Sequence, residues 1–355
     1  MSSSRLKEAF DCITDDDVTA DSILEEAKGG MKRKKTRHAA PLYSIVAVCA
    51  LCILATGGTA YAIAHADFFG AAWGTHGYGR TQTLTVKGGS ETYTYSRSFG
   101  DGTAPEGMQD HVLDIGMSVE GNGYTLTLES MAADSNGCGA VTFTLSNPNG
   151  VSYYKPAAEE GMLVLNSGEG PERTIGISMM FRDDWADTRC MINKDESTET
   201  SVRGVMYFAS PNGSEDYSTD IYWTINWSTG DRPEDQHEAS TDAFKVSDYI
   251  EAATFTCDSS TVELSPFSVR NHIEDIGYSA VADKIVLRLK DGTERVIVDD
   301  GVFNSILGYI QADGSEVDVM SELIDPSQVE QVVIEGTKAA SDNSGKQEAF
   351  SLTFS

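Results

Sequence analysis

Basic residues are scarce in this sequence. Its 355 residues include 26 Lys and Arg against 55 Asp and Glu, which gives a formal net charge of −29. Nucleic-acid binding needs a basic face that meets the phosphates, so this balance excludes DNA and RNA as expected partners. The imbalance is one-sided, because residues 1–40 hold equal numbers of basic and acidic residues and all of the excess acid follows residue 64.

Recognisable catalytic and metal-binding motifs are also missing. None of the six histidines has a second His or Cys at zinc-ligand spacing. There is no G-x-S-x-G motif, no S-x-x-K acyl-transfer set and no G-x-x-x-x-G-K-[ST] motif. Acidic pairs such as 183–184 could serve acid–base chemistry or calcium, but solvated loop charge is the more ordinary explanation. Residues 134–137 resemble the start of a calcium loop, yet Leu145 stands where an EF-hand needs Glu. We expect no enzyme activity, metal or cofactor.

Cysteine is sparse as well. Three of the six cysteines lie in or before a long apolar run, which leaves Cys138, Cys190 and Cys257 downstream. One disulfide among these three is possible in an oxidising compartment, but an odd number at wide spacings is not the framework of a small stapled domain. We interpret them as small buried residues.

The apolar run is the strongest single signal. It extends over 23 uncharged residues from Leu42 to Ala64 and as a helix would span about 34 Å, against a hydrocarbon core of about 30 Å. A basic cluster at 32–37 precedes it and the next basic residue is Arg80, which places the N-terminus in the cytoplasm. A cleaved secretory signal is the rival, but the long segment ahead of the run favours an uncleaved anchor. We predict one transmembrane helix at 41–64 with residues 65–355 outside.

Aromatic residues gather directly after this run. Phe68, Phe69, Trp73 and Tyr78 lie in a Gly-rich stretch. Aromatic rings just beyond a membrane span typically occupy the lipid–water interface. We therefore expect residues 65–108 to form a juxtamembrane linker with short strands and these rings to lie at the outer membrane surface.

The N-terminal segment, residues 1–40, has the pattern of two short amphipathic helices. Helices of this length are marginal alone in water, so their apolar faces are expected to fold against a partner or on the bilayer. A disordered tail attracted to anionic lipid is the alternative. The predicted partner-binding face consists of the apolar residues at helical spacing: Leu6, Phe10, Ile13, Ile23 and Leu24.

Downstream of Arg80 the apolar pattern has a period of two residues, as in 124–128, 141–145 and 285–289. Such alternation buries one face of a strand. Turn signals separate the runs, and Asp291-Gly292 predicts a two-residue hairpin. We predict a mainly β fold with two β-sandwich (immunoglobulin-like) domains, 109–262 and 268–355, the second closing with the strand EAFSLTFS.

Three segments carry a resemblance to a known family: LKEAF...SILEEAKGGMKRKK before the anchor, HVLDIGMSVEGNGYTLTLESMAAD after it, and ELIDPSQVEQVVIEGT near the end. In this order they resemble membrane-anchored, anti-sigma-factor-like proteins of Gram-positive bacteria whose extracytoplasmic domain has no assigned function. The resemblance implies that the cytoplasmic segment binds an extracytoplasmic-function sigma factor. It also implies that the ectodomain senses an external ligand of unknown identity. Residues 1–40 contain no H-x-x-x-C-x-x-C zinc motif.

Two functions of different classes follow from these observations. The first is a transmembrane sensor and regulator, which the amphipathic helices before the anchor favour. The second is a cell-surface adhesion or envelope-binding protein with no signalling role, which the β modules and the acidic exterior favour. A sigma-factor gene adjacent to the gene for this chain would favour the first.

Overall fold

The computed structural model describes residues 68–74, 81–88, 91–151, 175–182, 184–193, 196–228, 236–273, 281–300, 302–339 and 347–355. All of them belong to one compact unit, Thr59–Ser355. The predicted cytoplasmic helices and the predicted transmembrane helix lie outside the described residues. Within the described residues, no helix has the length and apolar composition that crossing a bilayer requires.

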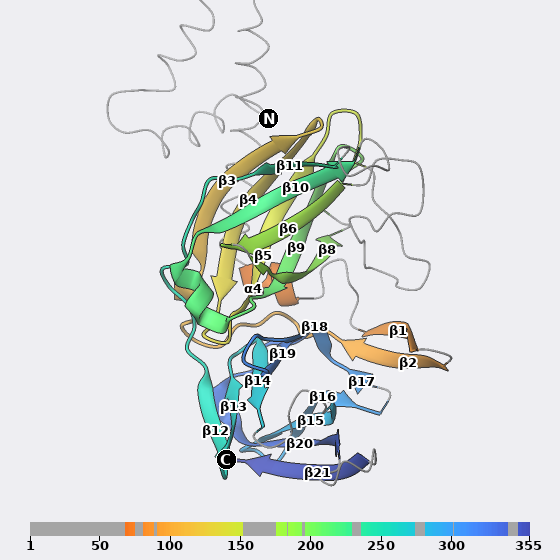
Figure 1. Ribbon diagram of the computed structural model, residues 1–355, viewed down its shortest axis with the longest axis vertical. Helices are drawn as coiled ribbons and strands as arrows, with labels where there is room; N and C mark the ends of the chain where they lie inside the picture. The colour runs from red at the N-terminus through yellow and green to blue at the C-terminus, as the bar shows by residue number, and fades with distance from the viewer. Residues whose placement is uncertain are drawn as a thin grey trace, which may run out of the picture. The chain divides into compact units, whose positions relative to one another are not determined.

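The described residues form a mainly β protein, which confirms the predicted class. Two sheets make up the first half (Figure 1). The five-stranded sheet has the order β3 (Leu113–Gly121), β4 (Tyr124–Ala133), β5 (Cys138–Ser146), β9 (Ser201–Ala209), β8 (Asp187–Asn193). The four-stranded sheet has the order β11 (Gln236–Ser240), β10 (Ile221–Ser228), β6 (Ile175–Phe181), β7 (Asp184–Trp185).

One hydrophobic core joins these two sheets, as in a β-sandwich. The alternating residues of β4 and β5 supply much of it, and Leu126, Leu128, Phe143 and Leu145 are all buried, as their period predicted. The four-stranded sheet adds Trp223 and its neighbours from the other side. Burial of one face of each strand therefore follows directly from the sequence pattern.

Two further sheets make up the second half. The five-stranded sheet has the order β12 (Ala253–Cys257), β13 (Ser260–Leu264), β14 (Ser268–His272), β19 (Glu316–Met320), β18 (Ser305–Ile310). The seven-stranded sheet has the order β1 (Thr81–Gly88), β2 (Glu91–Ser98), β17 (Val302–Phe303), β16 (Glu294–Asp299), β15 (Val281–Leu289), β20 (Val329–Ala339), β21 (Gln347–Phe354). A separate core of aliphatic and aromatic side chains lies between them.

Strand pairing places the start of this second half earlier than the interval 262–268 proposed from the sequence. Strands β13 and β14 pair with each other through Leu264 and Val269, and β12 pairs with β13. The second half therefore begins with β12. The β1–β2 hairpin, in the expected linker 65–108, also joins this half through a parallel bridge between Ser96 and Val302.

The hairpin predicted at Asp291-Gly292 is present but its loop is longer than two residues. Strands β15 and β16 pair as far as Arg288 and Glu294. Gly292 has φ of 84°, which glycine adopts without steric cost. The backbone N–H of Thr293 donates to the Asp291 carboxylate at 2.8 Å, and this local bond stabilises the longer turn.

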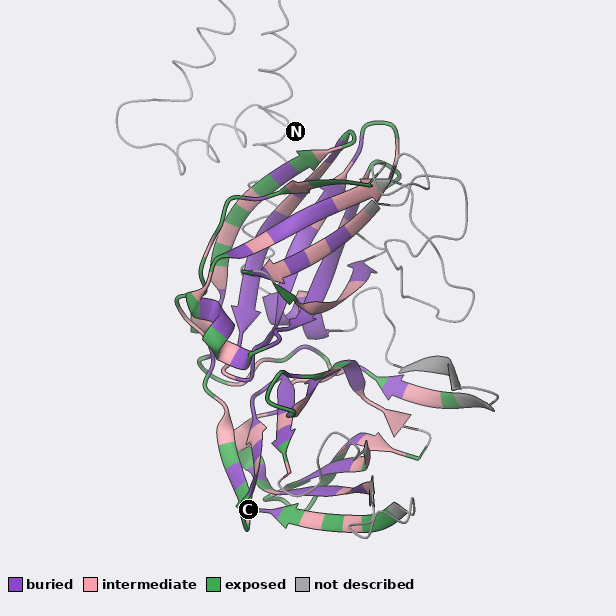
Figure 2. Cartoon of the chain, in the orientation of Figure 1, coloured by how far each residue is buried: buried purple, intermediate pink, exposed green. Residues whose placement is uncertain are grey.

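The short helix α4 (Phe68–Trp73) contradicts the expected position of the juxtamembrane aromatic residues. Phe68 and Trp73 are 0% exposed and Phe69 is 2% exposed, so these rings lie inside the protein and not at a membrane surface. Figure 2 colours the ribbon of the chain by this burial. They belong to a third core with residues of β5, β9, β18 and β19. Tyr78 lies outside the described residues. The described 3-10 helices are η1 (Met108–His111), η2 (Gly213–Ser218) and η5 (Pro326–Gln328).

Candidate functional site

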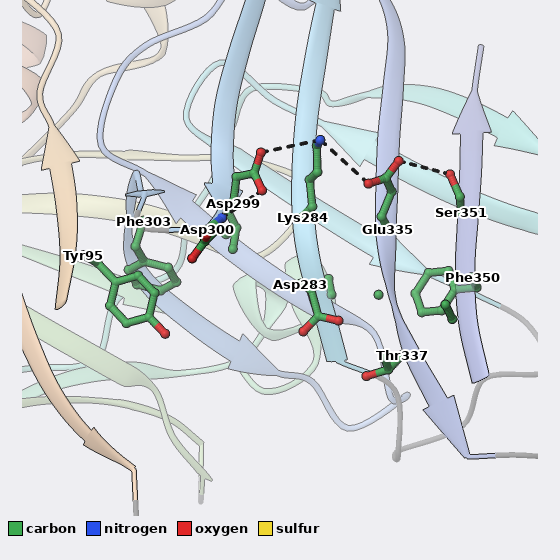
Figure 3. A pocket seen from close by; sticks show the side chains of 14 residues that line it. Tyr95, Asp283, Lys284, Asp299, Asp300, Phe303, Glu335, Thr337, Phe350 and Ser351 are labelled. Atoms are coloured by element: carbon green, nitrogen blue, oxygen red, sulfur yellow. Dashed lines mark hydrogen bonds and ion pairs between the residues drawn. The ribbon is translucent and has the colours of Figure 1, made fainter. Parts of the chain in front are cut away.

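A pocket of about 1050 Å³ lies along the seven-stranded sheet. Its wall draws on β2, β15, β16, β17, β20 and β21, so strands far apart in the sequence contribute to it (Figure 3). The lining residues are Tyr95, Ala282, Asp283, Lys284, Val298, Asp299, Asp300, Phe303, Glu335, Gly336, Thr337, Ala349, Phe350 and Ser351.

Lys284 supplies the positive charge of the lining. Its Nζ lies 3.5 Å from Asp299 Oδ2 and 3.7 Å from Glu335 Oε2, and Figure 3 shows the lysine between the two carboxylates. The hydroxyl of Ser351 donates to Glu335 Oε1 at 3.4 Å. The three charged side chains are 35%, 38% and 44% exposed, so water reaches the cluster and weakens each pair.

Two more carboxylates line the same pocket. Asp283 and Asp300 are exposed and form no ion pair with any described residue. Four carboxylates therefore face one ammonium group among the described lining residues, which carry excess negative charge.

Aromatic rings form part of the pocket wall. The rings of Tyr95 and Phe303 lie 6.1 Å apart between centroids at an angle of 50°, and Phe350 lies on the far side of the charged cluster (Figure 3). Arg97 is 1% exposed, and its Nε donates to the Phe303 carbonyl oxygen at 3.4 Å. The guanidinium carbon also lies 5.8 Å from the centroid of the Phe303 ring. Arg97 therefore fixes both the backbone and the ring of Phe303.

This combination of side chains suits the binding of a charged ligand. The hydroxyl groups among the described lining residues belong to Tyr95, Thr337 and Ser351. Carboxylates recognise positive charge, and aromatic faces attract cations and cover apolar surface. The pocket can therefore hold a ligand by charge and by aromatic contact.

A second polar cluster lies away from the pocket, around the buried carboxylate of Asp134. This carboxylate accepts hydrogen bonds from Ser265 Oγ at 2.5 Å, Ser268 Oγ at 2.6 Å and the Cys138 backbone N–H at 2.9 Å. Burial raises the pKa of Asp134 to about 6, although these hydrogen bonds oppose the rise. Asn136 Nδ2 donates to Ser268 Oγ at 2.8 Å. The β4–β5 turn is thus bonded to the β13–β14 turn.

The α4 segment packs against the same region of the protein. The indole N–H of Trp73 donates to the Met320 carbonyl oxygen at 2.9 Å, and the Tyr207 hydroxyl donates to the Ala72 carbonyl oxygen. Tyr207 belongs to β9 of the first half and Met320 to β19 of the second. The helix is therefore bonded to both halves.

Metal binding finds no support among the residues that the structure describes, where no group of three or more His, Cys, Asp or Glu is arranged to hold an ion. Cys138, Cys190 and Cys257 are all free thiols. Cys138 is buried, as predicted, and burial raises the pKa of its thiol well above the usual value. The other two are only partly buried.

The site residues proposed from the sequence, Leu6, Phe10, Ile13, Ile23 and Leu24, all lie outside the described residues. Conversely, sequence reasoning missed the pocket. Its charged members alternate with core residues on ordinary-looking strands, and only the pair Asp299-Asp300 at a strand end hints at it. The sequence singled out Asp134 only as the first residue of a segment that resembles a calcium loop but lacks its final Glu.

Comparison with known proteins adds little to this geometry. No protein-family model and no curated protein matches the chain. Among solved structures, the chain is similar to the crystal structure of the conserved domain protein from Bacillus anthracis, with 10% identity and a TM-score of 0.36. The alignment covers 69% of this chain and 87% of that chain. This likeness is too weak to support a conclusion about function.

Proposed function

We propose that this chain is a membrane-anchored extracytoplasmic sensor of the anti-sigma-factor kind. Its residues 1–40 bind an extracytoplasmic-function sigma factor in the cytoplasm, residues 41–64 cross the bilayer, and two immunoglobulin-like β-sandwiches outside receive the signal. The charge pattern around residues 41–64 supports this orientation.

The observation that carries the proposal is the burial of α4. This helix begins shortly after the predicted anchor, yet its aromatic rings are part of a core that includes Tyr207 and Phe267. A freely linked ectodomain could rotate and shift without disturbing its anchor. A segment packed into the ectodomain core instead couples the position of the anchor to the packing of the ectodomain.

The chain that follows α4 contributes a residue to the pocket. After α4 the chain forms the β1–β2 hairpin, and Tyr95 of β2 lines the pocket. The end of β2 is held by hydrogen bonds from the Ser98 N–H to Asn304 Oδ1 at 2.7 Å and from the Ser321 hydroxyl to the Ser98 carbonyl oxygen at 2.5 Å. A ligand that changes the packing of β2 can therefore alter the segment that leads to the anchor.

Topology is the first test of the proposal. A reporter that is active only outside the membrane should work when it is fused after Arg80 and fail when it is fused before Met31. The opposite pattern would reverse the assigned orientation.

Partner capture tests the regulatory role. Affinity-tagged full-length protein, isolated from its own cells in neutral detergent, should retain a sigma factor that mass spectrometry identifies. The F10D variant should lose that sigma factor, whereas E8A should keep it, because the helical spacing assigns Glu8 to the polar face of the predicted helix. Normal membrane insertion without any captured sigma factor would favour the adhesion or envelope-binding function instead.

A further inference from the structure

We infer that the pocket on the seven-stranded sheet binds a small organic cation: a protonated or quaternary amine that carries an apolar, preferably aromatic, group. This inference supplies a ligand class for the proposed sensor and in that sense rests on the proposed function. Binding itself is independent of any cytoplasmic partner, so the two can fail separately.

The charged residues of the lining favour a ligand of positive charge. Lys284 already lies beside Asp299 and Glu335, so an incoming anion would find its positive partner engaged by two carboxylates. Asp283 and Asp300 have no ion-pair partner among the described residues and can accept a new cation. Among the described lining residues an anion would meet four carboxylates and a cation one ammonium group, so Coulomb forces favour the cation.

The aromatic residues decide the chemical character of that cation. Tyr95 and Phe303 lie at one end of the charged cluster and Phe350 at the other (Figure 3). Aromatic faces attract ammonium groups within about 6 Å of the ring centroid and also cover apolar surface. A bare metal ion would leave these rings unused, and the described residues contain no metal-binding cluster. An amine with an apolar group would use both the carboxylates and the rings.

The size of the pocket agrees with a whole molecule and not a single ion. Its volume of about 1050 Å³ lies just above the range of roughly 300–1,000 Å³ that is typical of small-molecule sites. The acidic protein as a whole, with a net charge of −29, also raises the local concentration of cations.

The test uses purified full-length protein in neutral detergent and isothermal titration calorimetry with three probes of similar size. Benzyltrimethylammonium should bind saturably, whereas the neutral benzyl alcohol and the anionic phenylacetate should bind about tenfold more weakly or not at all. Raising the salt concentration should weaken binding of the cation, because the carboxylates are exposed.

Variants connect the binding to the named residues. The double variant D283N/D300N, which keeps the size of both side chains, and F303L should each weaken benzyltrimethylammonium binding about tenfold. The control E330Q changes an exposed glutamate elsewhere on β20 and should bind as the parent does. Circular dichroism and thermal unfolding establish that each variant is folded before it is titrated.

The inference is overturned if benzyl alcohol binds as tightly as the cation, if phenylacetate binds more tightly, or if no cation binds saturably. It is also overturned if E330Q lowers the affinity as much as D283N/D300N does. Cation binding without sigma-factor capture would leave this inference standing and reject the proposed regulatory function. Capture of a sigma factor without cation binding would reject this inference and leave the proposed regulatory function standing.

Discussion

The indole ring of Trp73 stacks on the ring of Phe267, with 4.9 Å between the centroids and an angle of 26° between the planes. Trp73 belongs to the short helix α4, and Phe267 lies in the turn between β13 and β14. The ring of Tyr207 from β9 and the same indole form a T-shaped pair, with centroids 5.6 Å apart. One side chain near the predicted anchor thus packs against both halves of the β region.

Replacing Trp73 with alanine should destabilise the protein by about 3–5 kcal/mol, because it removes a fully buried aromatic ring and leaves a cavity. The Trp73→Phe variant keeps a ring but loses the bond to Met320, so it should cost less. Trp185 is 48% exposed, and Trp185→Ala should change the free energy of unfolding by less than about 1 kcal/mol. Urea denaturation of the purified chain measures all three. Equal losses for Trp73→Ala and Trp185→Ala would show that α4 is not part of the core.

Stability should fall as the pH rises from about 4 to about 7, and Asp318 should account for part of that slope. Burial raises the pKa of Asp318 to about 7, the nearby Glu316 adds to the rise, and a hydrogen bond from Ser305 opposes it. Between its unfolded and folded pKa values the native carboxyl keeps a proton that the unfolded chain has lost, so the native state loses its advantage with rising pH.

The Asp318→Asn variant removes this titration. The parent should lose stability between pH 4 and pH 8 and the variant should not lose the part due to Asp318. The difference in free energy of unfolding, variant minus parent, should therefore rise by on the order of 3 kcal/mol over this range. The measurement is chemical denaturation across that range, with Asp110→Asn, an exposed carboxyl on η1, as the control. A parent and an Asp318→Asn variant with parallel pH profiles would contradict the prediction.

Arg203→Ala should cost about 3 kcal/mol of stability, because it leaves the carboxylate of Glu129 buried without its cation. Arg203 Nη2 lies 2.9 Å from Glu129 Oε2, and the Glu129 side chain is only 8% exposed. The matched control is Arg288→Ala, whose pair with Glu294 is about half exposed and should contribute less than about 1 kcal/mol. Thermal or urea unfolding compares the two. Similar losses at both sites would mean that burial does not distinguish these pairs.

Phe10→Asp should weaken binding of the cytoplasmic partner by at least about 2 kcal/mol, since it removes an apolar anchor and places an unpaired charge in the interface. Glu8→Ala should leave the affinity unchanged. Once the partner has been captured, the affinities of full-length parent and variants are compared by titration. Unchanged binding by Phe10→Asp would exclude Leu6, Phe10, Ile13, Ile23 and Leu24 as the binding face.

The β strands could be predicted because the alternation of apolar and polar residues within each strand indicates which of its faces is buried. Leu126 and Leu128 alternate with polar residues on β4, and that alternation follows from side chains that point to opposite faces of a strand. The hairpin between β15 and β16 was found from its turn residues, although the turn is longer than its Asp-Gly pair suggested. Such features depend on neighbours within a few positions, so the sequence contains them directly.

The position of α4 could not be predicted in the same way. The same aromatic cluster fits a membrane interface and a protein core equally well, because both surround a ring with apolar groups. What distinguishes the two environments is the presence of Tyr207 and Phe267 beside the cluster, and these residues lie far along the chain, in β9 and in the β13–β14 turn. The pocket likewise exists only because sheet pairing brings Tyr95 near Phe303 and Lys284 near Glu335.

By itself the sequence determined the acidic character, the β class and the alternating faces of the strands, and it predicts an anchor and its orientation. The tertiary structure alone decided that Phe68, Phe69 and Trp73 are buried, that Asp134 is bonded to Ser265 and Ser268, and that four carboxylates and three rings share one pocket. The physical reason is the range of the interactions. Strand periodicity arises from local backbone geometry, whereas burial of a given ring or carboxylate depends on residues that only folding brings together.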